Sequence, residues 1–151
     1  MILVVLLLTS PAKARLGENK EELVKRLGSI VKEVDEVAPG SQRKLGRAIT
    51  FEQENWRVTA VLVEGKCQKI SYQKLGEQIS EELQQHILYV NRAEQNWVEV
   101  TPGKPHWKRD DGAVAHYNEK ESAMVLQTTA YLDLVEKNSG SKRKSPRKTG
   151  E

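Results

Sequence analysis

One stretch of twelve residues, from His106 to Tyr117, concentrates the side chains of this chain that could do acid–base or metal chemistry. It reads HWKRDDGAVAHY and holds two histidines, two adjacent aspartates and an arginine. Imidazole and carboxylate groups bind zinc and act as general acids and bases. The stretch therefore poses a choice between a metal or catalytic site and a tight turn that joins two strands.

The register of a hairpin around Asp111-Gly112 decides whether the two histidines meet, because successive side chains of a strand point to opposite faces. A two-residue turn places Trp107 opposite His116 and points His106 to the other face. A three-residue loop with a left-handed Gly112 shifts the pairing by one residue and places His106 opposite His116. The sequence leaves both registers open.

In either register the two aspartates lie at the far end of the hairpin, three or more residues from the histidines, which is roughly 10 Å at about 3.3 Å per residue. A zinc site needs three or four protein ligands, and two imidazoles alone do not supply them. We therefore predict a structural hairpin with no metal ligand and no catalytic residue. In this hairpin Trp107 and Tyr117 pack across the strands, and Lys108 and Arg109 are solvated.

The remaining sequence holds no known catalytic motif: there is no GxSxG, no HExxH and no glycine-rich phosphate loop. His86 lies one turn from Leu83 and Val90 of a predicted helix, which indicates a packed or half-exposed histidine. Cys67 is the only cysteine, so no internal disulfide or CxxC pair can form. We predict a protein that is not an enzyme and has no cofactor.

Three tryptophans, Trp56, Trp97 and Trp107, are the side chains best able to stack on a sugar ring or to fill a partner's pocket. Their alternative role is in the core, since the chain has one phenylalanine and few other large aromatic residues. The core role is favoured, and the three residues remain the speculative binding residues of the chain.

Hydrophobic spacing predicts the elements that position these residues. A helix is expected from Lys20 to Leu27, with Asn19 as its N-cap and Gly28 after its end. Alternating residues from 49 to 72 predict a three-stranded antiparallel meander. A second helix after Ser80, strands near 97–100 and 122–128, and a last helix over 130–137 follow.

This order predicts an α+β fold with helices packed on an antiparallel sheet, as two helix-plus-meander units in series. The chain divides into three parts. Residues 15–137 form a single domain, with half-units of about 15–75 and 76–137. Residues 1–14 and 138–151 form a leader and a tail.

The leader, MILVVLLLTSPAKA, is an apolar run followed by Ala12-Lys13-Ala14, which is typical of a signal peptide cleaved near Ala14. A buried strand is the alternative, and seven apolar residues are too few for a membrane span, which needs about 20. The tail has no apolar anchor and is expected to be disordered. Its cations could attract an anionic polymer, lipid or nucleic acid: Lys142, Arg143, Lys144, Arg147 and Lys148.

The spacing Gly17-x5-Leu23-x4-Gly28, followed by a meander that carries VLVEGKCQKI, resembles the helix-then-hairpin unit of the small outer-membrane assembly lipoproteins (SmpA/OmlA type) and of beta-lactamase-inhibitor-like domains. The whole chain is similar to short exported bacterial proteins of unknown function. The resemblance implies the fold and export to the periplasm or the outside of the cell.

Three functions are therefore expected in order of preference. The first is a non-catalytic binding module of the cell envelope or the extracellular space, whose partner is a protein or an anionic envelope polymer. The second is a small hydrolase that uses His106 or His116. The third is an intracellular nucleic-acid-binding protein that uses the basic tail, which requires that the leader not be a signal peptide, since an exported protein would not meet nucleic acid.

Overall fold

The computed structural model describes residues 15–140. The predicted signal peptide and the five cations of the predicted tail lie outside these residues. The elements in chain order are α1 (Lys20–Leu27), β1 (Lys32–Val37), β2 (Lys44–Gln53), β3 (Trp56–Val63), β4 (Lys66–Lys74), α2 (Glu81–Val90), β5 (Trp97–Glu99), β6 (His106–Arg109), β7 (Val114–Asn118), β8 (Ala123–Gln127) and α3 (Thr129–Asn138).

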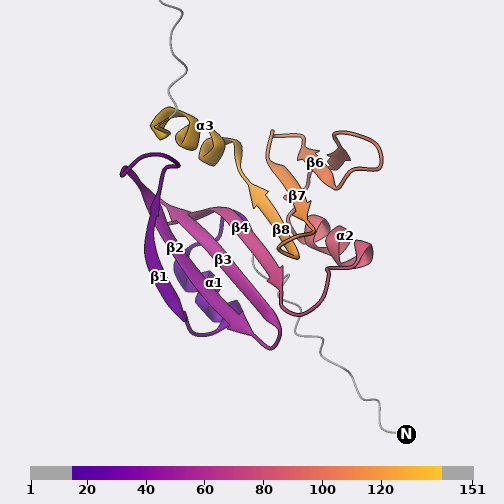
Figure 1. The fold of residues 1–151 in the computed structure, drawn as a ribbon, viewed down its shortest axis with the longest axis horizontal. Helices are drawn as coiled ribbons and strands as arrows, with labels where there is room; N and C mark the ends of the chain where they lie inside the picture. The colour runs from indigo at the N-terminus through magenta and orange to yellow at the C-terminus, as the bar shows by residue number, and fades with distance from the viewer. Residues whose placement is uncertain (1–14, 141–151) are drawn as a thin grey trace, which may run out of the picture.

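All eight strands belong to one antiparallel sheet with the order β1-β2-β3-β4-β8-β7-β6-β5 (Figure 1). Strands make up 40% of the described residues and helices 22%. The predicted α+β class with two helix-plus-meander units is therefore wrong, and the fold is a β-rich single sheet. The reason is the pairing of β4 with β8, which joins the two predicted units edge to edge into one sheet.

The register of this sheet places the large apolar side chains on one face. Ile49 lies opposite Ala60, Ala60 opposite Ile70 and Ile70 opposite Leu126, and the row continues on β7 and β6 through Ala115 and Trp107. These residues share one buried cluster with Leu23 and Leu27 of α1 and with Ile87 and Leu88 of α2. Helices α1 and α2 therefore cover the same face of the sheet.

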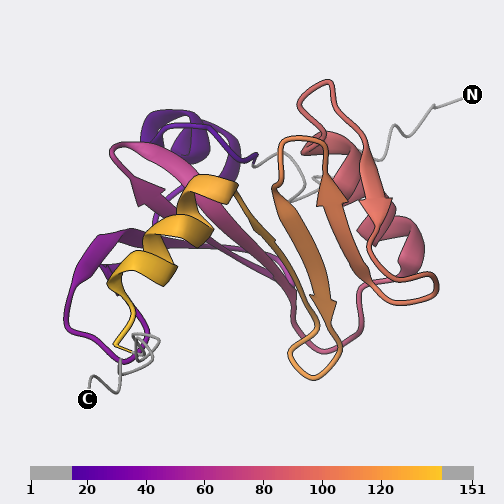
Figure 2. The ribbon, with the colours of Figure 1, turned by 90° about the horizontal axis from the view of Figure 1, so that it is seen from above.

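The opposite face is covered by α3 over part of its width. Tyr131 of α3 is 3% exposed and packs with Ala48 of β2 and Val61 of β3 in a second, smaller cluster. Figure 1 shows α1 behind β2 and β3, and Figure 2 shows α2 alongside the strands of the second half of the chain. Both histidines of the opening stretch lie on this opposite face, on β6 and β7.

The helix starts confirm Asn19 and Ser80 as the capping residues expected from the sequence, and Thr128 caps the third helix. The Asn19 side chain accepts a hydrogen bond from the Glu22 N–H, Ser80 accepts one from Leu83, and Thr128 accepts one from Tyr131. The three-stranded meander is also confirmed, as β2, β3 and β4. In the described part of the chain, no helix is long and apolar enough to cross a membrane.

Candidate functional site

The hairpin of the opening stretch has the three-residue loop. The Arg109 N–H donates to the Ala113 carbonyl at 2.8 Å and the Gly112 N–H donates back to the Arg109 carbonyl at 2.9 Å, which closes the loop over residues 110–112. Gly112 has a φ of 91°, a conformation that favours glycine. A Cβ atom there would also lie 2.7 Å from Thr129 Oγ1. Of the two registers, this one places His106 opposite His116.

The two histidines share the outer face, whereas the neighbouring carboxylates have other partners. Asp110 Oδ2 accepts a hydrogen bond from the Asn96 N–H at 3.2 Å, and Asp111 binds Arg109. Within residues 15–140, no group of three or more His, Cys, Asp or Glu side chains could hold a metal ion. The hairpin thus holds two paired imidazoles whose neighbouring carboxylates are engaged elsewhere.

The surroundings of the histidines differ. His116 is half-buried, and desolvation, with smaller contributions from His106 and Lys69, lowers its pKa from the usual value. His106 is exposed. His86 is also exposed, so its expected place on the packed stripe of the second helix is wrong; Gln84, Ile87 and Leu88 are the buried residues of α2.

The three tryptophans lie on the core face of the sheet. Trp56 is 8% exposed and Trp107 is 5% exposed, so neither presents a ring face to solvent. Trp97 of β5 is half-buried at the edge of the core. It lines an open pocket of about 500 Å³ together with Tyr89 and Arg92.

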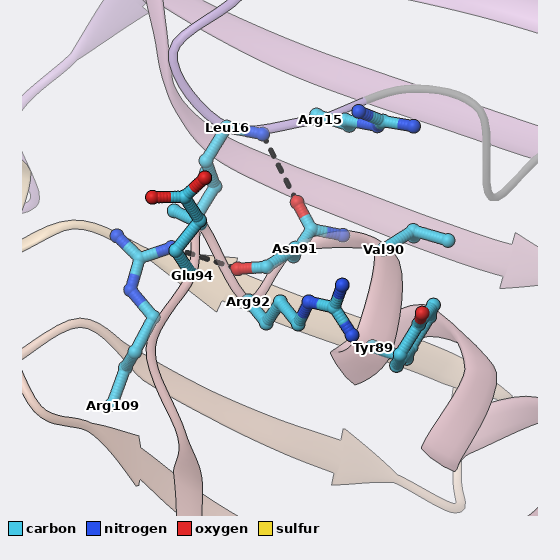
Figure 3. A pocket seen from close by; sticks show the side chains of 9 residues that line it. Arg15, Leu16, Tyr89, Val90, Asn91, Arg92, Glu94 and Arg109 are labelled. Carbon is cyan, nitrogen blue, oxygen red and sulfur yellow. Dashed lines mark hydrogen bonds between the residues drawn. The ribbon is translucent and has the colours of Figure 1, made fainter.

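A basic pocket lies where α2 ends against the start of the described chain (Figure 3). It has a volume of about 400 Å³, and it adjoins the Trp97 pocket, since Tyr89 and Arg92 line both. Arginine side chains come from three separate segments: Arg15 before α1, Arg92 after α2 and Arg109 at the end of β6. The only carboxylate in this lining is that of Glu94.

Asn91 holds these segments together. Its side-chain Oδ1 accepts a hydrogen bond from the Leu16 N–H at 3.0 Å, and its Nδ2 donates to Tyr72 Oη at 3.0 Å and to the Ile87 carbonyl at 2.9 Å. Its own carbonyl accepts a hydrogen bond from Arg109 Nη1 at 2.7 Å. Asn91 is 3% exposed. One buried amide therefore fixes the positions of Arg15 and Arg109 relative to the end of α2.

Arg109 is 7% exposed, so the prediction that it is solvated is wrong. It lies two residues after Trp107 on the same strand and therefore faces the core, where its guanidinium carbon lies 5.5 Å from the centre of the Trp97 ring. Asp111 accepts hydrogen bonds from its Nε at 2.8 Å and from its Nη2 at 2.6 Å. The charge of Arg109 is thus already neutralised.

Arg15 and Arg92 carry the unneutralised positive charge of the pocket. Neither has a salt bridge to a carboxylate of the described residues. The Arg92 guanidinium carbon lies 4.0 Å from the centre of the Tyr89 ring, a cation–π contact that positions the side chain and leaves its N–H groups without an anionic partner. Two arginines with unpaired donors at one pocket can bind a carboxylate or a phosphate.

Sequence reasoning missed this pocket. Arg15 is far from Asn91 and Arg92 in the chain, and none of the three belongs to a recognisable motif. They come together only because the first described residues form hydrogen bonds with Asn91 and Cys67. A partial signal existed for Arg109, because alternation from the apolar Trp107 places it on the buried face. No such signal exists for Asn91, which follows a helix as many exposed asparagines do.

Comparison with known proteins does not place the chain in a family. No protein-family model matches it, and no curated protein matches it. One match among solved structures is a cysteine-rich secretory protein from Staphylococcus aureus subsp. aureus Mu50, with 10% sequence identity and a TM-score of 0.41. The match covers 78% of this chain and 46% of that chain, so this chain spans less than half of that protein's length.

Proposed function

We propose that this protein is a small exported, non-catalytic binding protein that holds an anionic group of a cell-envelope polymer against Arg15 and Arg92. The observation that carries the proposal is the pair of arginines with no carboxylate partner among the described residues, at a pocket of about 400 Å³. An anion there gains charge-assisted hydrogen bonds from both guanidinium groups. The basic residues of the tail, outside the described residues, would add weak attraction to the same kind of polymer.

The frame of the pocket supports the proposal because it is rigid. Asn91 is buried and uses its side chain and its carbonyl in four hydrogen bonds. Arg92 is adjacent to it in the chain and is stacked on Tyr89. A side chain held in place before binding loses less conformational entropy when the ligand arrives, which favours affinity.

A hydrolase built on His106 and His116 has less support. The two imidazoles lie opposite each other, but Asp111 is bound to Arg109, and Asp110 is bound to the backbone of residue 96. A histidine acting as a general base is normally oriented by a third group that accepts its second N–H. The hydrogen bonds of the described residues include none to either imidazole.

The binding test is a titration of the isotope-labelled full chain with inorganic phosphate and, separately, with acetate, followed by NMR of backbone and arginine Nε–H signals. We expect saturable shifts for Arg15, Arg92 and Gly17, with affinity that falls as salt is added. Arg92→Gln should weaken binding about tenfold, the loss of one charge-assisted contact. The matched control is Arg43→Gln. Arg43 is an exposed arginine in the loop between β1 and β2, which lie at the opposite end of the sheet from β5 and β6.

Equal affinities for Arg92→Gln and the control would contradict the binding site. A stronger response to phosphate than to acetate would identify phosphate-bearing polymers as the ligand class, and the reverse would identify carboxylate-bearing ones. The export part has its own test, which is cell fractionation with N-terminal sequencing. Full-length protein with an intact Met1 in the cytoplasm would contradict export.

A further inference from the structure

Glu18 is a buried carboxylate that lacks the hydrogen bonds such a group normally has. The residue is 6% exposed, and neither side-chain oxygen accepts a hydrogen bond of good geometry from the described residues. Arg26 of α1 lies 3.0 Å from Oε2 with its Nε, and the Arg26 side chain is 37% exposed. Burial is the main cause that raises the pKa of Glu18, and the Arg26 charge opposes it. Both carboxylate oxygens of Glu18 therefore keep unused capacity to accept hydrogen bonds.

The turn that contains Glu18 points its side chain back at the nitrogen of Arg15. The Glu18 N–H donates to the Arg15 carbonyl at 3.4 Å. The Arg15 N–H is close enough to the carboxylate to lower its pKa. Glu18 lies three residues after Arg15. In a capping box, a glutamate three residues after the N-cap residue accepts a hydrogen bond from the backbone N–H of that residue in the same way.

The nitrogen of Arg15 is held in place by the residues that follow it. The Leu16 N–H donates to Asn91 Oδ1 at 3.0 Å, the Gly17 N–H donates to the Cys67 carbonyl at 2.7 Å, and the Cys67 N–H donates to the Glu18 carbonyl at 2.8 Å. These three bonds tie residues 16–18 to β4 and to the end of α2. The position of the Arg15 nitrogen relative to Glu18 is therefore set by the fold.

We propose that cleavage of the leader between Ala14 and Arg15 creates an α-ammonium group at Arg15 that pairs with the buried Glu18 carboxylate and fixes Arg15 in the anion pocket. This inference rests on the export part of the proposed function. The leader sequence Ala12-Lys13-Ala14 is the type of site at which a signal peptidase cuts. In the cleavage, water adds across the Ala14–Arg15 peptide bond, so that Ala14 becomes a carboxylate and Arg15 an amine, which takes the released proton.

The pairing changes the electrostatics of Glu18. Before cleavage the carboxylate faces the Arg26 guanidinium and the neutral Arg15 N–H. After cleavage the N–H is replaced by an ammonium group with three donors and a full charge. Charge-assisted hydrogen bonds are roughly twice as strong as neutral ones. An ion pair completed at a buried, fixed position loses little entropy and offsets the desolvation of the carboxylate. Processing should therefore stabilise the fold and order the side chain of Arg15.

The test compares three purified chains: 1–151, 14–151 and 15–151. The two shorter chains keep every described residue, and 14–151 places its ammonium group one residue before the proposed position. At pH 7 we expect 15–151 to have the highest melting temperature, on the order of 5 °C above 14–151. Glu18→Gln should remove this difference, because the amide carries no charge to pair with the ammonium.

The pH dependence has a defined sign. A free α-amino group has a pKa of about 7.7 to 8.0, and pairing with Glu18 raises it in the folded chain. The extra stability of 15–151 should be complete below that range and be lost as the pH rises through the raised pKa.

The other charged or titratable groups around Glu18 are Arg26 and Glu22 of α1 and Cys67 and Tyr72 of β4. Burial raises the pKa of Cys67 to about 12 and that of Tyr72 further, so neither thiol nor phenol ionises in this window.

A second measurement covers the case in which Glu18→Gln does not fold. The rate at which an acylating reagent modifies the α-amino group at pH 7.5 depends on its free-amine fraction, so we expect 15–151 to react about sevenfold more slowly than 14–151 if pairing raises the pKa by one unit. Equal rates and equal melting temperatures would overturn the inference. Phosphate binding and export are measured separately from these quantities, so failure of the proposed function would be recognised on its own.

Discussion

Arg109 and Asp111 form a two-point ion pair inside the β6–β7 hairpin, with Nε 2.8 Å from Oδ1 and Nη2 2.6 Å from Oδ2. The remaining terminal nitrogen of the guanidinium group donates to the Asn91 carbonyl at 2.7 Å. The pair therefore couples the loop of the hairpin to the end of α2. It also holds the Asp111 carboxylate away from the histidines.

Replacement of Arg109 by Met should lower the free energy of unfolding by about 3 kcal/mol. Methionine fills a similar volume but removes the hydrogen bonds that Arg109 donates to the Asn91 carbonyl and to the Asp111 carboxylate. Breaking a buried pair by removing one partner costs about 3–5 kcal/mol. The Asp111 side chain is 41% exposed, which places the expected loss at the lower end. Urea denaturation monitored by tryptophan fluorescence measures it.

The matched control is Arg57→Met, which removes an arginine whose side chain is 43% exposed and lies 3.1 Å from Glu52. An exposed pair contributes about 0–1 kcal/mol, so this variant should remain close to the parent protein. A loss of less than about 1 kcal/mol for Arg109→Met would contradict the structural role assigned to the buried pair.

The Asn91–Tyr72 contact should show energetic coupling. Tyr72 is fully buried, burial raises the pKa of its phenol, and its Oη accepts a hydrogen bond from Asn91 Nδ2. We expect Tyr72→Phe to cost about 1–2 kcal/mol, since it leaves a buried amide donor unsatisfied. Asn91→Ala should cost more, about 3 kcal/mol, because Leu16 and Ile87 also lose their partner.

The double variant should cost less than the sum of the two single variants, by about 1 kcal/mol. Strict additivity would mean that the contact does not contribute to stability. The same variants report on the pocket, because Asn91→Ala should also weaken phosphate binding, whereas Tyr72→Phe leaves the bond between Asn91 and Leu16 in place.

Local features of the fold were predictable from the sequence, and long-range ones were not. The helix from Lys20 to Leu27 was predicted to the residue, because its cap and its terminal glycine are local signals. The pairing of β4 with β8 joins residues fifty or more positions apart, and no local pattern specifies it. That single pairing converts the expected two units into one sheet and overturns the predicted fold class.

The candidate site divides in the same way. The sequence narrowed the hairpin to two registers, and a tertiary contact favours one of them: Gly112 packs against Thr129 of α3, which leaves no space for a side chain. The anion pocket depends on contacts of residues 15–18 with β4 and with Asn91, which are far apart in the sequence. Arg15 and Arg92 could not be distinguished from the other arginines of the chain before these contacts were known.

Cys67 should resist thiol reagents in the folded protein. It is fully buried, and burial raises its pKa to about 12, so very little reactive thiolate forms at pH 8. We expect the rate of modification by Ellman's reagent to rise with urea in proportion to the unfolded fraction, because the thiol reacts only when the core opens. A fast rate without denaturant would mean that β4 opens locally and that the segment 15–18, which is bonded to Cys67, is not held in place.

His116 should make the protein less stable as the pH falls below about 6.5. Its pKa is lowered in the folded chain, chiefly by desolvation and then by the charges of His106 and Lys69. The unfolded chain therefore binds a proton at a higher pH than the folded chain does, so stability falls between the ordinary pKa and the lowered one and then levels off. Melting temperatures measured from pH 7.5 to pH 5 should show this decline, and His116→Gln should reduce it.

The control is His86→Gln on the exposed side of α2, which should leave the decline unchanged. If both variants gave the parent profile, the half-buried position of His116 beside His106 would not affect stability, and the loss at acid pH would have to come from the carboxylates instead.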